Sequence, residues 1–269
     1  MVAGQHPGSY PSSAPGLGFS GVSCAADRLR AAATVEELAT CLSAVARDLG
    51  FPFHALVHHA DQNRPPPQFM FLQNYPKRWV ETYAHRGLYR HDPARRLASV
   101  RPASFIWADL ESLMPLSGTE RRTLEQGRHA GLAGGFTIPL HTAGERPASC
   151  SFAIETGQSL PSEILAAAEY VAHVAFGALF DLLHPRRALE APRLTRRQEE
   201  CVDLLARGKT DWEIGAILGL TEGTVSQYLK AARHRFGVTR RTQLAMAAAS
   251  FGLVGFDEVA SWQYSSSGI

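Results

Sequence analysis

Several aromatic side chains and one carboxylate crowd into a short stretch of this sequence. Tyr75, Trp79, Tyr83, Asp92 and Trp107 fall within about thirty positions. Indole and phenol groups donate hydrogen bonds, a carboxylate accepts them, and aromatic rings provide apolar walls. The set therefore suits a pocket for a small amphipathic molecule that has an amide and an apolar tail.

A simpler explanation fits the same residues. Trp79 and Tyr83 are four positions apart, so on a helix they share one face, where they could equally be core aromatics. Asp92 precedes Pro93 and is compatible with a turn, whereas a buried Asp92 would need hydrogen-bonding partners. The residues alone leave the pocket and the core as alternatives, and a core role is the commoner one.

A second polar set lies near the C-terminus, on a segment with helical periodicity. One face of this segment is apolar and consists of Val225, Tyr228, Leu229, Ala232 and Phe236. The opposite face carries hydrogen-bonding and cationic groups, namely Glu222, Ser226, Gln227, Lys230, Arg233 and Arg235. Groups of these kinds read base edges and contact phosphates in duplex DNA.

Two shorter helices are expected before this one. Thr195 with Gln198 and Thr210 with Glu213 each form a capping box at a helix start, and Gly219-Leu220-Thr221 is a turn of helix-turn-helix type. In that arrangement we expect sequence readout from Glu222, Ser226, Gln227 and Lys230. Phosphate contacts are expected from Lys209, Thr210, Arg233 and Arg235. The alternative is a small helical bundle with a charged surface.

The distribution of charge agrees with a DNA-binding C-terminus. The chain of 269 residues has a net charge of only +2, but positions 193–241 hold ten basic and six acidic residues, which makes that segment +4 and the remainder −2. With 45% hydrophobic and 19% charged residues, the composition is that of a globular protein. The four cysteines form no C-x-x-C pair, so we expect no zinc site and a reducing cytoplasm.

The preceding part of the chain is expected to be an α+β domain that positions the aromatic set. Helices are predicted over residues 25–49, 77–89, 118–129 and 161–183, and strands over 51–59, 68–72, 103–107, 135–141 and 148–155. This order predicts an α/β/α layered domain with an antiparallel sheet, followed by a small all-α domain. The predicted limits are a disordered segment 1–22, the α+β domain 25–183, a linker 184–193, a helix-turn-helix domain 194–252 and a tail 253–269.

About fifty C-terminal residues resemble the LuxR-type DNA-binding domain. The similarity rests on Leu194-Thr195, on the run from Leu205 to Thr210, on Glu213-Ile214-Gly215, and on Phe236-Gly237-Val238. The family usually has glutamate where Gln198 stands and often histidine where Tyr228 stands. Gln198 is still able to complete a capping box.

Residues 25–183 resemble the acyl-homoserine-lactone-binding domain of quorum-sensing LuxR-type regulators. That resemblance implies that Trp79 donates to the lactone carbonyl, Asp92 accepts from the ligand amide N–H, and Trp107 packs on the lactone ring. It further implies that Tyr75 and Tyr83 contact the acyl side and its carbonyl, while Ser151 supplies a hydroxyl to the amide carbonyl. Gly135, within Gly134-Gly135-Phe136-Thr137-Ile138-Pro139, matches another signature of the family.

The resemblance further implies a transcription factor that binds double-stranded DNA as a homodimer, with the lactone as effector and RNA polymerase as a possible partner. A LuxR-type solo regulator, which answers to another small molecule or to none, is the alternative. No enzyme is expected, because the sequence has no G-x-S-x-G, P-loop or H-E-x-x-H motif. No cofactor and no membrane span are expected either. His54, His58, His59 and Asp61 do not have the spacing of a metal site, since neighbouring strand residues point to opposite faces.

Overall fold

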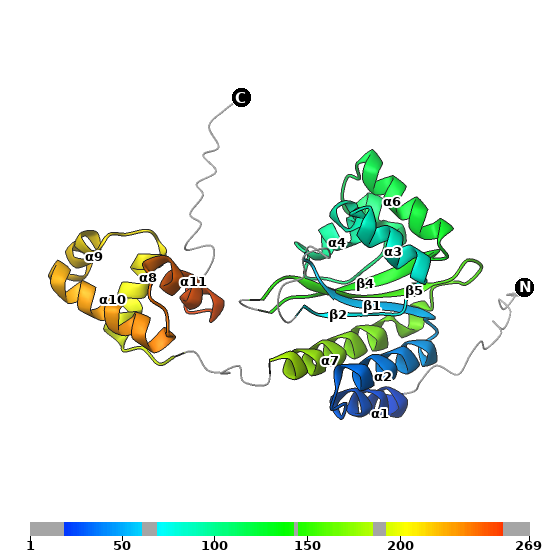
Figure 1. Cartoon of the computed structure of the whole chain (residues 1–269), viewed down its shortest axis with the longest axis horizontal. Helices are drawn as coiled ribbons and strands as arrows, with labels where there is room; N and C mark the ends of the chain where they lie inside the picture. The colour runs from blue at the N-terminus through cyan, green and yellow to red at the C-terminus, as the bar shows by residue number, and fades with distance from the viewer. Residues whose placement is uncertain (1–18, 61–68, 143–144, 185–191, 255–269) are drawn as a thin grey trace, which may run out of the picture. The chain divides into compact units, whose positions relative to one another are not determined.

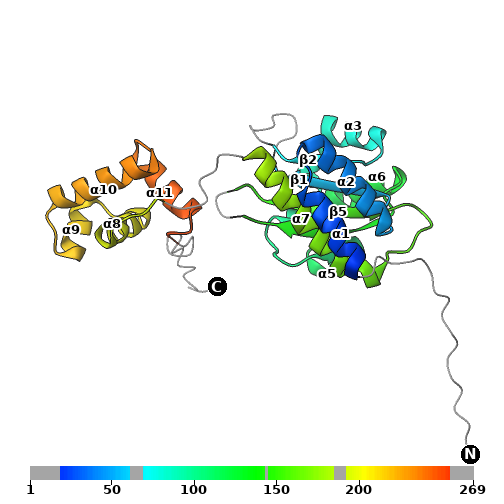
Figure 2. The same ribbon diagram turned by 90° about the horizontal axis from the view of Figure 1, so that it is seen from below.

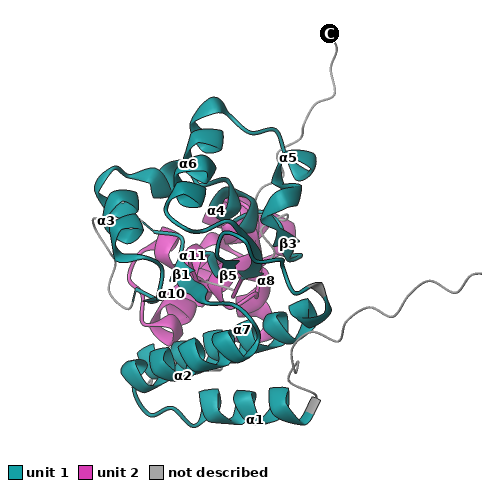
Figure 3. Ribbon diagram, turned by 90° about the vertical axis from the view of Figure 1, so that its right-hand side faces the viewer, with its two compact units in different colours: residues 1–140, 147–185 teal, residues 141–146, 186–269 magenta. Residues whose placement is uncertain are grey.

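The computed structural model describes residues 19–60, 69–142, 145–184 and 192–254. The chain divides into two compact units, residues 1–140 with 147–185 and residues 141–146 with 186–269 (Figures 1 and 3). Each unit has its own hydrophobic core. The linker residues 185–191 lie outside the described residues.

The first unit is built on a five-stranded antiparallel sheet in the order β2-β1-β5-β4-β3. Its strands are β1 (Phe53–His58), β2 (Phe71–Gln73), β3 (Phe105–Ile106), β4 (Gly134–Leu140) and β5 (Ala148–Ile154). In the central strand β5, Ser151 is paired with Ala55 of β1 and with Thr137 of β4. Because strand side chains alternate between faces, the odd-numbered residues of these three strands share one face of the sheet.

Helices cover both faces of the sheet, which confirms the layered α+β architecture (Figures 1 and 2). One layer consists of α1 (Phe19–Arg30), α2 (Val35–Asp48) and α7 (Leu165–Leu183). The other contains α3 (Lys77–His85), α4 (Pro93–Ala98), α5 (Leu110–Leu113) and α6 (Gly118–His129). Short 3-10 helices span Leu88–His91, Trp107–Asp109 and Ser162–Ile164.

The main core lies between the even-numbered face of the sheet and α1, α2 and α7. Leu56, Ile138 and Phe152 of the sheet are completely buried against Leu42 of α2 and Val171 of α7. Among the described residues, α7 is the one helix long and apolar enough to cross a membrane, but its buried side chains belong to this core. Its length and composition are therefore weak evidence for a span.

Two long helices predicted from periodicity are each divided. Residues 25–49 form α1 and α2 rather than one helix, because Thr34 adopts an extended conformation and its hydroxyl accepts a hydrogen bond from the Glu37 N–H. The first helix starts at Phe19, so residues 19–22 are not disordered as predicted; residues 1–18 lie outside the described residues. Residues 77–89 are divided at Gly87, which has a φ of +65°.

Smaller differences affect the ends of elements. The strand predicted over 103–107 shortens to Phe105–Ile106, and Trp107 begins a 3-10 helix instead. The strand predicted over 68–72 is found at Phe71–Gln73, and Gln68 lies outside the described residues. The helix predicted from Pro161 starts as 3-10 helix at Ser162 and becomes α-helical at Leu165.

The second unit contains four helices in its described part: α8 (Arg196–Ala206), α9 (Asp211–Leu218), α10 (Glu222–Phe236) and α11 (Arg241–Ser250). Both predicted capping boxes are present, and Gln198 completes the first by accepting from the Thr195 N–H at 3.0 Å. The turn between α9 and α10 is tight: a Cβ on Gly215 would lie 2.7 Å from the Leu220 carbonyl oxygen. This confirms the predicted helix-turn-helix.

Two features of this unit were not predicted. Helix α11 packs on α8 and α10, and its Leu244 and Ala248 are completely buried. Val254 is only 3% exposed in the same core, although the sequence placed it in a tail beyond residue 252. The helical domain therefore includes Val254.

Candidate functional site: a sensor cavity and a DNA-binding face

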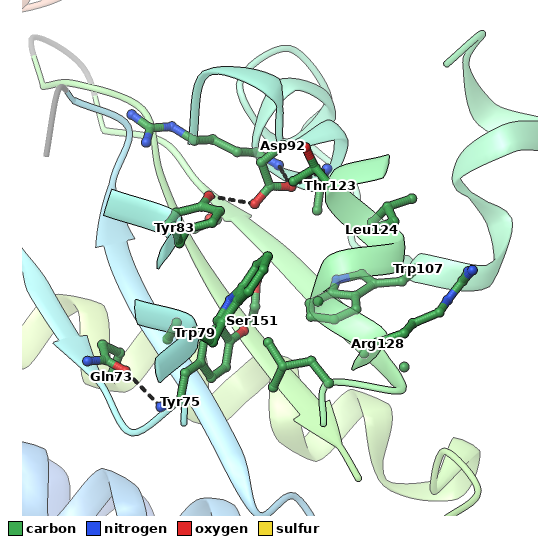
Figure 4. Close-up of a pocket in the computed structure, with 18 of the residues that line it drawn as sticks. Gln73, Tyr75, Trp79, Tyr83, Asp92, Trp107, Thr123, Leu124, Arg128 and Ser151 are labelled. Carbon is green, nitrogen blue, oxygen red and sulfur yellow. Dashed lines mark hydrogen bonds between the residues drawn. The ribbon is translucent and has the colours of Figure 1, made fainter. Parts of the chain in front are cut away.

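A cavity of about 310 Å³ lies between the odd-numbered face of the sheet and the layer of α3, α4 and α6 (Figure 4). Its lining contains all seven residues predicted to bind the ligand: Tyr75, Trp79, Tyr83, Asp92, Trp107, Gly135 and Ser151. These residues come from α3, the start of α4, β4, β5 and the segments between them. The aromatic set therefore lines a cavity and at the same time belongs to a small hydrophobic cluster around Trp79.

Helix α3 presents its aromatic pair to this cavity. The rings of Trp79 and Tyr83, one turn apart, have centroids 5.4 Å apart. Trp79 is 7% exposed and packs close to Gly127 of α6, where an added Cβ would lie 3.6 Å from the indole. The indole N–H of Trp79 makes no hydrogen bond within the described part of the chain, so it is available as a donor.

Asp92 has two roles at the same time. Its Oδ1 accepts hydrogen bonds from the backbone N–H groups of Ala94 and Arg95, at 2.9 and 3.3 Å, and so caps α4. Its Oδ2 accepts a 2.6 Å hydrogen bond from the hydroxyl of Tyr83. A carboxylate oxygen has two lone pairs, so Oδ2 is able to accept a second donor from the cavity.

The two phenols of the cavity are held in the neutral, donating form. Burial, followed by the nearby negative charge of Asp92, raises the pKa of Tyr75 above its ordinary value. The same two causes raise the pKa of Tyr83, and its hydrogen bond to Asp92 adds to the effect. At physiological pH both side chains are therefore hydrogen-bond donors.

A chain of hydroxyl groups fixes the far wall of the cavity. The indole N–H of Trp107 donates to Oγ1 of Thr137 at 2.8 Å, and this hydroxyl is 2.8 Å from Oγ of Ser151. Gly135 lies beneath Trp107, because a Cβ at this position would be 2.6 Å from the indole ring. The indole N–H of Trp107 is therefore already hydrogen-bonded within the protein, and Trp107 offers its ring face to the cavity.

Sequence reasoning missed several residues that line the cavity. Polar examples are His59, Gln73, Arg95, Thr123, Arg128 and Ser149. The alternation of faces in β5 could have indicated Ser149, since it shares a face with Ser151. Thr137 lies in the quoted glycine-containing signature, but its role requires the cross-strand register.

The histidines in β1 and directly after it lie on opposite faces of the sheet. His54 and His58 are buried on the even-numbered face, whereas His59 reaches the cavity on the other. Within the described residues no three metal-ligating side chains come together, and Asp61 lies outside them.

In the second unit, α10 presents the predicted polar face to the surface. Val225, Leu229 and Ala232 are buried, while Glu222, Ser226, Gln227 and Lys230 are exposed. The N-terminal half of α10 is therefore free, within this unit, to enter a major groove.

The four residues predicted to contact phosphate have different environments. The Thr210 side chain caps α9 and donates to Glu213, so only its exposed surface remains for DNA. Arg235 is exposed and donates to the backbone carbonyl of Arg193, and Lys209 and Arg233 are half-buried. The guanidinium of Arg241 donates hydrogen bonds to the Lys209 carbonyl and to the Asp211 carboxylate, and these bonds fix the start of α9.

Both units match known protein families. Residues 34–179 match the family described as autoinducer binding domain, and residues 192–248 match the one described as bacterial regulatory proteins, luxR family. The chain belongs to the LuxR family of autoinducer-binding regulators. It joins an autoinducer-binding domain to a LuxR-type DNA-binding domain, as the sequence resemblance predicted.

Individual relatives agree with this assignment. A Sinorhizobium fredii protein, y4qH, named as an HTH-type transcriptional regulator, is 27% identical over 73% of this chain and 60% of its own length. The quorum sensing-dependent regulator RpaR of Rhodopseudomonas palustris is 26% identical over 85% of this chain and 91% of its own. The crystal structure of Escherichia coli SdiA is 25% identical with a TM-score of 0.60, covering 87% of this chain and 98% of SdiA. A similar match is SdiA in complex with octanoyl-rac-glycerol.

Proposed function

We propose that this LuxR-type regulator binds an N-acyl-homoserine lactone in the cavity and that the occupied protein binds DNA as a homodimer. The main support is the amphipathic lining, with a free indole N–H on Trp79, a carboxylate oxygen on Asp92 and the ring face of Trp107. A homoserine lactone amide offers the matching carbonyl and N–H, and its acyl chain suits the apolar part of the lining.

The proposed contacts follow the chemistry of each group. Trp79 donates to the lactone carbonyl and Asp92 accepts from the amide N–H. The amide carbonyl accepts from Tyr75 or Ser151, and Tyr83 holds Asp92 while contacting the acyl side. Trp107, with Gly135 beneath it, covers the lactone ring. The protein itself supplies every one of these groups, and we propose the lactone as its effector without a cofactor or a catalytic step.

The proposed coupling is thermodynamic. A ligand that binds the folded domain alone stabilises it, by about 2.7 kcal/mol when its concentration is a hundred times Kd. Folded sensor domains then pair and bring two α10 helices to a near-palindromic site. Helix α7 is a candidate dimer surface, since Tyr170 on it is 45% exposed.

The proposal also includes a protein partner for the DNA-binding domain and a cellular location. Trp212 and Ile217 of α9 are 68% and 55% exposed, and exposed apolar side chains on a DNA-binding domain suit a protein partner such as RNA polymerase. We place the regulator in the cytoplasm, where its DNA and a diffusible lactone meet.

One alternative effector has an observation in its favour. One solved structure has SdiA in complex with octanoyl-rac-glycerol, whose ester carbonyl and hydroxyl groups also suit an amphipathic cavity. An ester has no amide N–H, but the free hydroxyl groups of this molecule are able to donate to the carboxylate of Asp92. The glycerol ester has no lactone ring to lie against the ring face of Trp107, so the lactone is the effector that we propose.

Thermal melting of the full chain with a panel of ligands tests the proposal. Acyl-homoserine lactones should raise Tm and the yield of soluble protein, and 1-octanoyl-glycerol should raise Tm less. Electrophoretic mobility shifts should then detect salt-sensitive DNA binding in the presence of the best lactone. The lactone assignment fails if no lactone alters Tm, or if the glycerol ester is the stronger ligand.

A further inference from the structure

The cavity has a second polar end, beyond the groups assigned to the lactone and its amide. Along β5 the cavity face carries Ala153, Ser151 and Ser149 in that order. Ala153 is paired with Gly135, beneath Trp107, whereas Ser149 is paired with Val57 near the end of β1. An acyl chain that starts at Ser151 and runs away from Trp107 therefore reaches Ser149.

The hydrogen bonds at Ser149 determine which of its atoms is available. The hydroxyl of Ser99 donates to the Arg95 carbonyl at 2.9 Å, so its oxygen accepts the 2.7 Å hydrogen bond from Nδ1 of His59. In the neutral imidazole this places the proton on Nδ1 and leaves Nε2 as an acceptor. Nε2 is 2.9 Å from Oγ of Ser149, so with His59 neutral Ser149 donates to it and the Ser149 oxygen remains an acceptor towards the cavity.

Arg95 provides a donor at the same end. It lines the cavity, and one guanidinium nitrogen, Nη2, donates to the carbonyl of Ala60, the residue next to His59. Its guanidinium carbon also lies 5.3 Å from the ring centroid of Tyr89. The other nitrogen, Nη1, is buried and has no hydrogen-bond partner among the described residues. A buried charged donor without a partner is costly, so this position favours a ligand atom that accepts from it.

An acceptor on Ser149 and a donor on Arg95 together match a hydroxyl group, which both donates and accepts. We propose that the effector carries a hydroxyl at the far part of its acyl group, which donates to Oγ of Ser149 and accepts from Nη1 of Arg95. This inference rests on the proposed lactone-sensing function and narrows its ligand class. Two residues of strand separate Ser151 from Ser149, roughly 6.6 Å, so the carbon that bears the hydroxyl lies about five bonds from the amide carbonyl carbon.

A matched pair of ligands tests this assignment. N-(6-hydroxyhexanoyl)-homoserine lactone and N-heptanoyl-homoserine lactone have the same chain length, and they differ in a terminal OH or CH₃. Titration calorimetry on the full chain should give a Kd about tenfold or more lower for the hydroxylated ligand, as expected for a hydrogen bond to a charged group. Equal affinities, or tighter binding of the heptanoyl lactone, would overturn the proposal.

Variants then assign the preference to particular residues. Arg95→Met and Ser149→Ala should each reduce the ratio of the two Kd values towards one. The ratio is measured within one variant, so a general loss of stability does not affect it. Arg128→Met is the matched control, because Arg128 lies beside Trp107 at the other end of the cavity (Figure 4), and it should keep the wild-type ratio. An unchanged ratio in both Arg95→Met and Ser149→Ala would contradict the inference.

The Tm and Kd measurements distinguish a failure of this inference from a failure of the proposed function. If the heptanoyl lactone raises Tm and the hydroxyl adds nothing, lactone sensing stands and the hydroxyl assignment is rejected. If neither lactone raises Tm, both are rejected.

Discussion

The hydroxyl of Tyr83 and the carboxylate of Asp92 form a 2.6 Å hydrogen bond, while the other oxygen of the same carboxylate holds the first turn of α4. One side chain therefore connects α3, α4 and the cavity. A ligand amide that donates to Asp92 would bind to a group already fixed in position by its neighbours. Preorganisation of this kind lowers the entropy cost of binding.

Asp92→Asn should separate ligand recognition from folding. The asparagine oxygen is able to cap α4, as asparagine is a good N-cap, so the ligand-free Tm should change little. The amide NH₂ then takes the place of Oδ2 and offers the ligand N–H a donor where it needs an acceptor, so lactone affinity should fall about tenfold to a hundredfold. Titration calorimetry gives the affinity, and an Asp92→Asn variant that binds as tightly as wild type would remove Asp92 from the site.

The sequence predicted seven residues that line the cavity, but it did not predict the hydrogen bonds that join them to one another and to Thr137. Trp79 and Tyr83 share a face because of helical spacing alone, which local sequence determines. That Asp92 accepts from Tyr83, or that Thr137 joins Trp107 to Ser151, depends on the packing of α3 on α4 and on the register of β4 with β5. Neither is encoded in a local pattern.

Errors in the predicted elements have local physical causes. The break before α2 arises from Thr34 and Glu37, a capping pattern that competed with a continuous apolar periodicity. Helix α11 has four alanines and few large apolar residues, so its periodicity is weak, although Leu244 and Ala248 are completely buried. Burial of small residues depends on neighbouring helices and is not visible in hydrophobic patterning.

Gly135→Ala should disturb the ligand site more than the fold. The added Cβ would lie 2.6 to 2.8 Å from three atoms of the Trp107 indole, so the ring must move. Its displacement breaks the hydrogen bond to Thr137 and shifts the wall that we assign to the lactone ring. Lactone affinity should fall at least about tenfold, whereas overpacking costs the fold only about 1–3 kcal/mol.

Gly134→Ala is a neighbouring control for that substitution. There the nearest atoms are 3.4 and 3.5 Å away on the flexible side chain of Ile154, so the added methyl should be tolerated. Calorimetric titration of both variants with one lactone provides the comparison. Similar affinities for the two would show that Trp107 does not depend on Gly135.

His54 should make the sensor domain sensitive to acid. Burial lowers the pKa of His54 from 6.5 to about 4, and its Nδ1 has no partner among the described residues. The unfolded chain then binds the proton more readily, so stability is complete above pH 6.5 and is lost as the pH falls towards 4. Between pH 7 and pH 5 the loss should be about 2 kcal/mol from this residue.

Urea unfolding of wild type and of His54→Asn at the two pH values measures that contribution. The variant should lose about 2 kcal/mol less between pH 7 and pH 5, and the control His129→Asn, at an exposed position on α6, should behave as wild type. If His54→Asn retains the full pH dependence, the acid sensitivity belongs to other groups.

The polar face of α10 should divide into residues that select sequence and residues that add affinity. Gln227 is exposed on the N-terminal half of the helix, where a base edge in the major groove is within reach. Gln227→Ala should therefore lose about 1–3 kcal/mol of binding free energy on the preferred site and little on unrelated DNA.

Arg233 lies further along the helix and is expected to contact phosphate. Arg233→Gln should therefore weaken binding to all duplexes alike and reduce the salt slope by about one. Fluorescence anisotropy with specific and random duplexes, at several salt concentrations and with saturating lactone, separates the two effects. A salt slope unchanged by Arg233→Gln, or an equal loss on both duplexes in Gln227→Ala, would mean that α10 meets DNA through a different face.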